Sequence, residues 1–224
     1  MTPSHVMMFC AGFGTRMGAL TQDRPKPLIE VAGKTLFDHS LDLVRAIEPD
    51  KIVSNLHYMA DVMTTHLAPL GVQTNLETPD ILETGGGLRA ALPLLGKDPV
   101  FTTNTDAIWV GPNPFVMLRD HWDPARMDAL LICVPRAQCV GHAGGDFEMT
   151  PDGRLSRGRE FIYGGVQILK TDLLHTVADP AFSLNLIWDQ MKAQDRLFGL
   201  GYPGRWCDVG TPEGIILAEE MLSV

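Results

Sequence analysis

Short apolar runs alternate with longer segments of helical periodicity through the first half of the chain. The apolar runs predict strands over Val6–Cys10, Ile52–Asn55, Val72–Asn75, Pro99–Thr103 and Ala129–Val134. The segments between them predict helices over Leu36–Ile47, Met59–Leu67 and Gly87–Leu95. Strands and helices that alternate in this way predict a largely parallel sheet with helices on both faces.

The pattern changes after Pro135. Asp146–Met149, followed by a Pro-Asp-Gly turn signal, predicts a hairpin, and Tyr163–Leu169 predicts a further strand. Thr211 as N-cap, with Pro and Glu directly after it, predicts the start of a helix over Ile215–Leu222. We therefore expect one α/β domain over residues 1–224, with three α/β/α layers, a mixed, mostly parallel central sheet and a small β insertion.

Composition narrows the classes of function. The net charge of −9 argues against a nucleic-acid partner, because such binding depends on clustered Lys and Arg. No run approaches eighteen apolar residues and the amino terminus lacks a secretory signal, so we expect neither membrane insertion nor export. The cysteines form no C-x-x-C pair and no zinc-like spacing, which favours reduced thiols in the cytoplasm; they are Cys10, Cys133, Cys139 and Cys207.

A glycine-rich segment follows the first predicted strand. Gly12 and Gly14 allow backbone N–H groups to converge on phosphate oxygens, and Arg16 and Lys26 add positive charge. The spacing excludes the Walker phosphate loop and misses the dinucleotide G-x-G-x-x-G motif by one residue. Glycine spacing alone leaves an ordinary turn and a nucleoside triphosphate site as equal alternatives.

Two aspartates come directly after apolar runs. Asp106 ends the run that includes Val100–Thr103, and Asp208 follows Trp206 and Cys207. Mg²⁺ commonly takes one or two protein carboxylates together with substrate phosphates, so the pair suits a magnesium site. In isolation each aspartate is better explained as a turn or capping residue than as a metal ligand.

Two other glycine clusters suggest close ligand approach. Leu82–Gly87 ends in three glycines before a predicted helix, and Gly164-Gly165 lies inside a predicted strand. The histidines show no H-x-x-x-H or H-E-x-x-H spacing, so a zinc site is not expected. His57, at the end of a predicted strand, is better explained as a hydrogen-bonded structural residue than as a substrate contact.

The segment Ala11-Gly12-Phe13-Gly14-Thr15-Arg16-Met17, followed by Pro25-Lys26-Pro27-Leu28, resembles the amino-terminal signature of the sugar-1-phosphate nucleotidyltransferases. Leu82–Gly87 and Trp206–Thr211 match further segments of that family, and the resemblance runs from about residue 5 to 220. It implies a Rossmann-like nucleotidyltransferase domain. Thr105 departs from the pattern, because relatives usually carry a smaller residue there, which puts the tightness of that turn in doubt.

The resemblance also implies roles for individual residues. Arg16 would hold the departing β- and γ-phosphates, Lys26 would bridge the α-phosphate and the incoming sugar phosphate, and Asp106 and Asp208 would bind Mg²⁺. The expected nucleotide-binding residues are Ala11, Gly12, Gly14, Thr15, Glu77, Gly85 and Asp106. The expected residues on the sugar side are Asn104, Glu160, Tyr163, Gly165, Asn185 and, as a weaker candidate, Trp188.

The reaction implied is attack by a sugar 1-phosphate on the α-phosphorus of a nucleoside triphosphate, with loss of pyrophosphate. The Leu82–Gly87 segment matches the uridylyltransferase pattern, which implies UTP and N-acetylmuramate 1-phosphate as substrates. Glu77 argues the other way, because a carboxylate beside the base would favour cytosine or guanine. The alternatives are a guanylyl- or cytidylyltransferase that acts on mannose 1-phosphate or phosphocholine, and a non-catalytic nucleotide or sugar-phosphate sensor.

Overall fold

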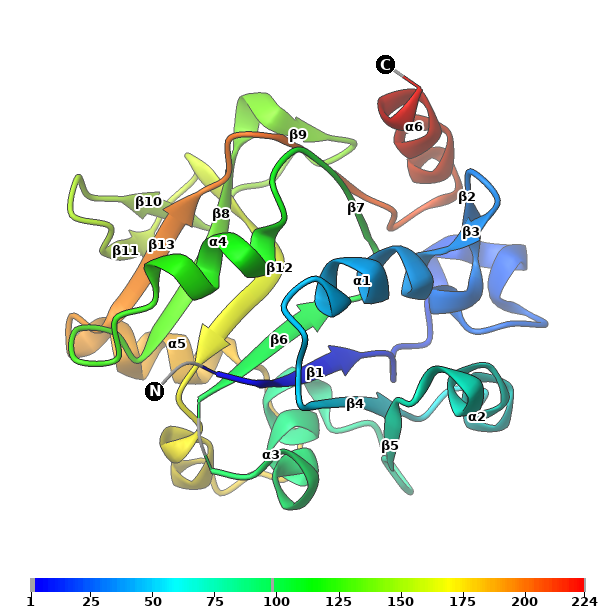
Figure 1. Ribbon diagram of the computed structural model, residues 1–224, viewed down its shortest axis with the longest axis horizontal. Helices are drawn as coiled ribbons and strands as arrows, with labels where there is room; N and C mark the ends of the chain where they lie inside the picture. The colour runs from blue at the N-terminus through cyan, green and yellow to red at the C-terminus, as the bar shows by residue number, and fades with distance from the viewer. Residues whose placement is uncertain (1–2, 98, 224) are drawn as a thin grey trace.

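The structure of the protein, a computed structural model, describes residues 3–97 and 99–223. Figure 1 shows a central twisted sheet with helices on both sides. Its strands are β1 (His5–Phe9), β4 (Lys51–Leu56), β5 (Gln73–Leu76), β6 (Val100–Asn104), β8 (Ala129–Pro135), β10 (Phe147–Met149), β11 (Leu155–Arg157), β12 (Phe161–Leu169) and β13 (Leu197–Gly201). Their order is β11-β10-β12-β6-β1-β4-β5, and β8 pairs with both β12 and β13.

Strand β1 lies at the centre of the parallel part of this sheet. It pairs in parallel with β4 and β6, and Met7 lies opposite Val53 on one side and Thr102 on the other. Strand β5 continues the parallel arrangement beside β4, whereas β12 is antiparallel to β6 and β8, so the sheet is mixed. The carboxyl ends of β1, β4 and β6 therefore meet at one edge.

Among the residues that the structure describes, six α-helices surround the sheet: α1 (Leu36–Arg45), α2 (Ala60–Leu67), α3 (Glu83–Leu95), α4 (Pro114–His121), α5 (Asn185–Ala193) and α6 (Pro212–Leu222). Successive side chains of β1 alternate between two cores. Val6 and Met8 pack with apolar residues of α1, α2 and α4 on one face. Met7 packs with residues of α3 and α5 on the other face. The expected three-layer arrangement is thus confirmed.

A smaller three-stranded sheet, β7-β14-β9, lies beside the carboxyl edge of the main sheet. Its strands are β7 (Ala107–Val110), β9 (Cys139–Val140) and β14 (Arg205–Asp208), and the hairpin of β2 (Glu30–Val31) and β3 (Lys34–Thr35) is separate. Helix α6 packs with this region through a third apolar cluster that includes Met17, Val209 and Met221. The final helix thereby covers the segment that follows the glycine-rich loop.

The predicted strands of the first half agree with the structure within one or two residues, but helix α3 begins at Glu83 instead of Gly87. Its three glycines lie inside the first turns of the helix because the segment around Phe182 packs directly on them. An added Cβ at Gly85 would overlap the Phe182 ring, and one at Gly86 would overlap the Pro180 carbonyl oxygen. Tertiary contact therefore overrides the low helix propensity of glycine.

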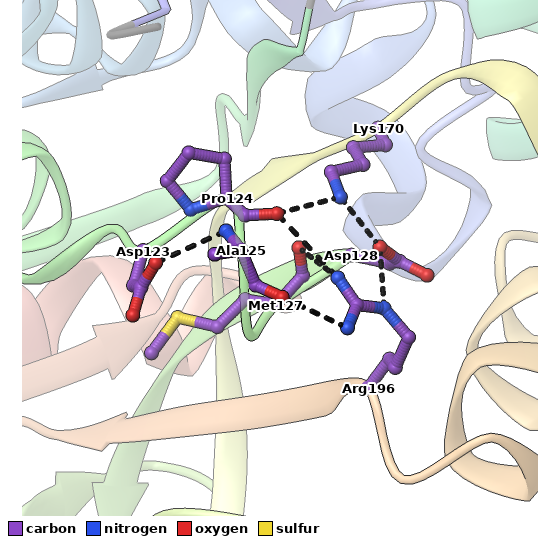
Figure 2. A network of polar contacts seen from close by, with 7 residues as sticks. All are labelled: Asp123, Pro124, Ala125, Met127, Asp128, Lys170 and Arg196. Atoms are coloured by element: carbon purple, nitrogen blue, oxygen red, sulfur yellow. Dashed lines mark hydrogen bonds and ion pairs between the residues drawn. The ribbon is translucent and has the colours of Figure 1, made fainter.

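Figure 2 shows an ionic network that includes Asp128, Lys170 and Arg196. It lies at the end of the sheet opposite the glycine-rich loop, because Lys170 follows Leu169, which pairs with the first residue of β6. Asp128, directly before β8, accepts hydrogen bonds from Lys170 at 2.8 Å and forms an ion pair with Arg196 at 2.8 Å. Lys170 follows β12 and Arg196 precedes β13, so the three charges join the ends of three neighbouring strands. Burial alone would raise the pKa of Asp128, but hydrogen bonds from Lys170 and Arg196 outweigh it and lower the pKa.

Asp128→Asn is expected to lower the free energy of unfolding at pH 7 by about 1–2 kcal/mol, because it weakens two charged hydrogen bonds. A pKa that is lower in the folded state adds stability above the unfolded value of about 3.9, and this stability disappears as pH falls through the folded pKa. Urea unfolding at pH 7 and pH 3 checks both effects. A deficit that persists undiminished at pH 3 would contradict the ionic explanation.

Candidate active site

The glycine-rich loop begins where β1 ends, and Gly14 is the residue that its shape requires. Gly14 has φ +64°, and an added Cβ would lie 2.8 Å from Cβ of Lys26. Gly14 thus allows Lys26 to approach the loop. Gly12 differs, because an added Cβ there would meet no protein atom within 4 Å, although Gly12 lines the main cavity described below.

Two side chains anchor the end of β1 from its neighbouring strands. The Cys10 backbone N–H donates to Oδ1 of Asn55 at 3.0 Å, and Asn55 lies near the end of β4. Oγ1 of Thr105, directly after β6, donates to the carbonyl oxygen of Phe9 at 2.8 Å. This hydrogen bond accounts for a threonine where relatives usually carry a smaller residue, since the hydroxyl fixes the point at which the loop leaves the sheet.

Lys26 and Asp106 form an ion pair at one end of the loop. Nζ of Lys26 lies 2.7 Å from Oδ2 of Asp106, and Lys26 is 9% exposed. Lys26 lies between Pro25 and Pro27 and is the first residue of a short 3-10 turn, Lys26–Leu28. This turn places the buried side chain of Lys26 beside Asp106, which follows the carboxyl end of β6.

Asp208 lies beside Asp106 through the pairing of β7 with β14. Asp208 is opposite Ala107, and the N–H of Val209 donates to the Asp106 carbonyl oxygen at 2.8 Å. Burial raises the pKa of Asp208, and the charge of Asp106 raises it further, while Lys26, Arg16 and His142 oppose the shift. These five side chains therefore interact electrostatically within one site.

Arg16 and His142 complete the charged group. An added Cβ at Gly210 would lie 2.8 Å from Nη1 of Arg16, so the guanidinium rests against the backbone after Asp208. Nδ1 of His142 lies 3.6 Å from Oδ2 of Asp208, and its ring contacts that of Trp206 with centroids 5.8 Å apart. Sequence reasoning missed His142, because only the fold brings the glycine-rich segment around it to β14.

A cavity of about 340 Å³ opens between these residues and helix α3. Its lining includes the expected site residues Ala11, Gly12, Gly14, Thr15, Arg16, Lys26, Asn104 and Asp106. Further lining residues are Asn55, Ile81, Glu83, Thr84 and Gly210. The sequence-based residues thus come together in one place. Its lining contains two cations, Arg16 and Lys26, and two acids, Glu83 and Asp106, together with amides and hydroxyls.

Glu77 and Gly85 lie behind this cavity and do not belong to its lining. The Gly85 N–H donates to the Phe182 carbonyl oxygen at 2.8 Å, so protein packing already uses it. Glu77 is 2% exposed, and both of its carboxyl oxygens accept hydrogen bonds from the protein. Nδ1 of His57 donates to the Glu77 carbonyl oxygen at 2.9 Å, as expected for a structural histidine.

A second cavity of about 230 Å³ shares Phe9, Thr84 and Asn104 with the first. Of the residues expected on the sugar side, it is lined by Asn104, Tyr163, Asn185 and Trp188. Asp146, Ser183 and Leu184 also line it. The two cavities therefore form one continuous cleft along the carboxyl edge of the sheet.

Asp146 is the one acid in the second cavity, among the residues that the structure describes. Its Oδ2 accepts a hydrogen bond from the Tyr163 backbone N–H at 2.9 Å, and no group of the described residues donates to Oδ1. The sequence predicted only a hairpin that begins at Asp146. The available signal was an acid at the first residue of that hairpin.

Tyr163 and Trp188 pack on one another with ring centroids 4.8 Å apart, and they form an aromatic wall of this cavity. Nε1 of Trp188 donates to Oε1 of the fully buried Gln167 at 2.9 Å, which fixes the ring. Burial raises the pKa of Tyr163 well above its usual range. Tyr163 is therefore a neutral wall residue at physiological pH.

Glu160 and Gly165 do not line the second cavity. Glu160 is exposed beside the start of β12. Gly165 has φ +91°, and an added Cβ would lie 3.1 Å from Cβ of Asn104. The close approach of Asn104 thus explains the glycine at position 165. Asn104, and not Gly165 itself, lines the cavity in which a ligand could bind.

The donor set at Asp106 and Asp208 suits a hard divalent cation. Two carboxylates on adjacent strand ends repel one another, as the raised pKa of Asp208 reflects, and a cation between them would relieve that repulsion. Within residues 3–97 and 99–223 no group of three His, Cys, Asp or Glu side chains is arranged to hold a metal. The assignment of Asp106 and Asp208 as metal ligands therefore stays a prediction.

The four cysteines have no role in this chemistry. All are free thiols, and Cys10, Cys133 and Cys207 are buried. Burial raises the pKa of Cys10 to about 11 and that of Cys207 to about 11, so neither is a thiolate nucleophile at neutral pH. Their interpretation as packing residues agrees with the structure.

Comparison with known proteins gives related sequences over almost the whole chain. A family model described as a MobA-like NTP transferase domain matches residues 6–147. A protein of Caulobacter vibrioides named N-acetylmuramate alpha-1-phosphate uridylyltransferase is 39% identical, with 99% of this chain and 98% of that protein covered. The protein of the same name from Neisseria meningitidis is 28% identical, with 92% of each chain covered.

Solved structures show the same fold at low sequence identity. The crystal structure of HddC from Yersinia pseudotuberculosis has a TM-score of 0.76 at 20% identity and covers 99% of this chain and 100% of its own. The likeness supports the layered arrangement described above.

Asp208→Asn is expected to raise the thermal unfolding temperature at pH 7. The pKa of Asp208 is higher in the folded state than the unfolded value of about 3.9, so its ionised form costs stability at neutral pH, and the amide avoids this cost. Below about pH 4 the wild-type carboxyl is protonated in both states, and the two proteins should converge. Calorimetry across this pH range, with exposed Asp50→Asn as control, checks the expectation. A lower unfolding temperature of Asp208→Asn at pH 7 would refute it.

Proposed function

The chain belongs to the MobA-like NTP transferase family, and we propose that it transfers UMP from UTP to N-acetylmuramate 1-phosphate and releases pyrophosphate. Nucleotidyl transfer to a sugar 1-phosphate follows from its relatives; the base and the sugar are the proposal. The observation that carries it is the cleft of two adjoining cavities, the larger of which is lined by the glycine loop and by the Lys26–Asp106 ion pair.

The nucleotide is proposed to bind in the larger cavity. Its triphosphate would lie along the loop residues Ala11, Gly12, Gly14 and Thr15, which line the cavity and leave it free of a Cβ at Gly12. The base would lie toward Asn55, Ile81 and Thr84. The objection that Glu77 would favour cytosine or guanine loses its force, because both oxygens of Glu77 are already occupied and Glu77 does not line the cavity.

The sugar phosphate is proposed to bind in the second cavity, against the Tyr163–Trp188 wall. Asn104, shared by both cavities, would contact the sugar near the reacting phosphate. Asp146 and Asn185 would accept or donate hydrogen bonds to ring substituents. This arrangement places the 1-phosphate of the sugar toward the first cavity, where Lys26 and Asp106 lie.

In the proposed reaction an oxygen of the sugar phosphate forms a bond to the α-phosphorus of UTP, and the bond from that phosphorus to the bridging oxygen of pyrophosphate breaks. Such a transfer requires positioning and charge neutralisation and no protein nucleophile. Lys26 would neutralise charge that accumulates on the α-phosphate, and Arg16 would hold the leaving pyrophosphate. Mg²⁺ bound by Asp106 and Asp208 would supply further neutralisation of phosphate charge.

No helix of the described residues has the length and apolar character that crossing a membrane requires. We place the proposed reaction in the cytoplasm, where free thiols such as the four of this chain persist and UTP is available.

A matrix of UTP, CTP, dTTP, GTP and ATP against a panel of sugar 1-phosphates, measured as pyrophosphate release with Mg²⁺, tests the proposed function. We expect the highest kcat/KM for UTP with N-acetylmuramate 1-phosphate. A clear purine preference would overturn the uridylyl assignment. If none of the sugar 1-phosphates in the panel supported pyrophosphate release, the acceptor class would be overturned.

Lys26→Ala and Arg16→Ala should differ in their kinetics. Lys26→Ala is expected to lower kcat by an amount that corresponds to about 2–4 kcal/mol, as for loss of one transition-state donor. Arg16→Ala should weaken UTP binding as well as turnover, since its group would contact the pyrophosphate portion in the ground state. Steady-state kinetics with exposed Lys97→Ala as control separates them, and identical defects would remove the distinction.

Asp146→Asn is expected to raise KM for the sugar phosphate about tenfold, the effect of one hydrogen bond to a charged group, with KM for UTP within about twofold of wild type. The matched control is Glu148→Gln on the exposed side of β10. An unchanged KM for the sugar phosphate, or an equal rise in both KM values, would exclude Asp146 from the sugar site.

A further inference from the structure

Glu77 is a buried acid that the proposed chemistry does not use. It follows β5, is 2% exposed, and has no Lys, Arg or His in ion-pair contact among the residues that the structure describes. Burial of a carboxyl group without a cation is costly unless hydrogen bonds replace those of water. The hydrogen bonds around the Glu77 carboxyl group should therefore indicate its role.

Both oxygens of Glu77 are held by neighbouring groups. Oε1 accepts a hydrogen bond from Nδ2 of Asn55 at 2.6 Å, and Oε2 accepts one from the Leu82 backbone N–H at 2.7 Å. Helix α3 packs closely on the same carboxyl group, since an added Cβ at Gly87 would overlap Oε1. Glu77 thus fixes the segment 78–82 and the start of α3, whose neighbours Ile81 and Thr84 line the main cavity.

Asn55 passes this constraint to the phosphate loop. Its Nδ2 donates to Glu77, so its Oδ1 is turned toward Cys10 and accepts the Cys10 N–H at 3.0 Å. Cys10 is the first residue after β1. Three hydrogen bonds therefore run from Leu82 through Glu77 and Asn55 to the start of the glycine loop, and they join the two walls of the nucleotide cavity.

We propose that Glu77 is a positioning residue that sets the distance and orientation between the base-side wall and the phosphate loop, through Asn55 and Cys10. A nucleotide spans both walls, so its affinity depends on their relative placement to within fractions of an ångström. The carboxyl group suits this role because it accepts two hydrogen bonds from two donors that face it. Neither an amide nor an alcohol can accept both without a conflict of donors.

The decisive substitution is Glu77→Gln, which conserves size and shape. Glutamine has one acceptor oxygen, so either Asn55 or the Leu82 N–H would face another donor. If the Asn55 amide turned to accept from Gln, its NH₂ group would face the Cys10 N–H and transmit the conflict to the loop. Glu30→Gln, at an exposed position of β2, is the matched control for loss of one carboxylate.

A double substitution restores the pattern with its polarity reversed. In the Asn55→Asp, Glu77→Gln protein, the new Asp accepts from the Cys10 N–H with one oxygen and from the Gln NH₂ with the other. The Gln oxygen remains available to the Leu82 N–H, and the net charge equals that of wild type. Asn55→Asp alone leaves two carboxyl groups facing one another and should not restore anything.

Three readouts separate positioning from general stability: hydrogen exchange of the Cys10 amide by NMR, affinity for uridine by NMR titration, and kcat against KM for UTP. Glu77→Gln should show faster Cys10 exchange and about tenfold weaker uridine binding, the equivalent of one lost buried hydrogen bond. KM for UTP should rise with little change in kcat. In the double variant only Cys10 protection is expected to recover, because residue 55 lines the nucleotide cavity and a carboxylate there would act on the base directly.

The proposal rests on the proposed function only for the choice of nucleoside. If wild type prefers another base in the substrate matrix, the uridylyl assignment fails, and the same variants are then measured with the preferred nucleoside. Wild-type Cys10 protection and nucleoside affinity in Glu77→Gln would overturn the positioning role. So would a double variant that folds and still lacks Cys10 protection, and so would failure of both variants to fold, since Glu77 would then serve the core alone.

Discussion

Strand β1 ends at the centre of a parallel sheet, and side chains from both neighbouring strands bind its last backbone groups. Asn55 accepts the Cys10 N–H and Thr105 donates to the Phe9 carbonyl oxygen, so the loop leaves the sheet at a fixed point. The loop, the ion pair of Lys26 with Asp106 and the position of Arg16 against Gly210 all depend on that point. Ligand sites at the carboxyl edge of such sheets are general, because adjacent parallel strands end there together.

The charge of the site runs against that of the chain. A protein of net charge −9 concentrates Lys26 and Arg16 beside two aspartates, and the buried Asp208 has a raised pKa. Carboxylates that repel one another lower stability, and a polyanion with a divalent cation is the kind of ligand that such a site accommodates. The opposite edge is built differently, since the Asp128 network there pairs one carboxylate with two cations. Stability and function thus occupy opposite edges of one sheet.

Periodicity was sufficient for the strands and helices of the first half, because buried parallel strands and amphipathic helices have strong local signals. It missed β13, whose sequence is Leu-Phe-Gly-Leu-Gly. It also started α3 four residues late, because contacts of Gly85 and Gly86 with residues 180–182 stabilise the first turns of the helix despite their glycines. The charged residues of the site came from motifs. His142 and Asp146 did not, since their neighbours Asp208 and Tyr163 are distant in sequence and only the fold brings them together.

We propose that one cleft holds the nucleotide in the larger cavity, which Lys26 and Asp106 line, and the sugar in the adjoining cavity. A crystal structure with the UDP-sugar product and Mg²⁺ tests this most directly. The account predicts the diphosphate beside Lys26 and Asp106, the uracil near Asn55 and Thr84, and the sugar against Tyr163 and Trp188 with Asp146 in hydrogen-bond contact. A sugar outside the second cavity, or a diphosphate away from Lys26, would contradict it.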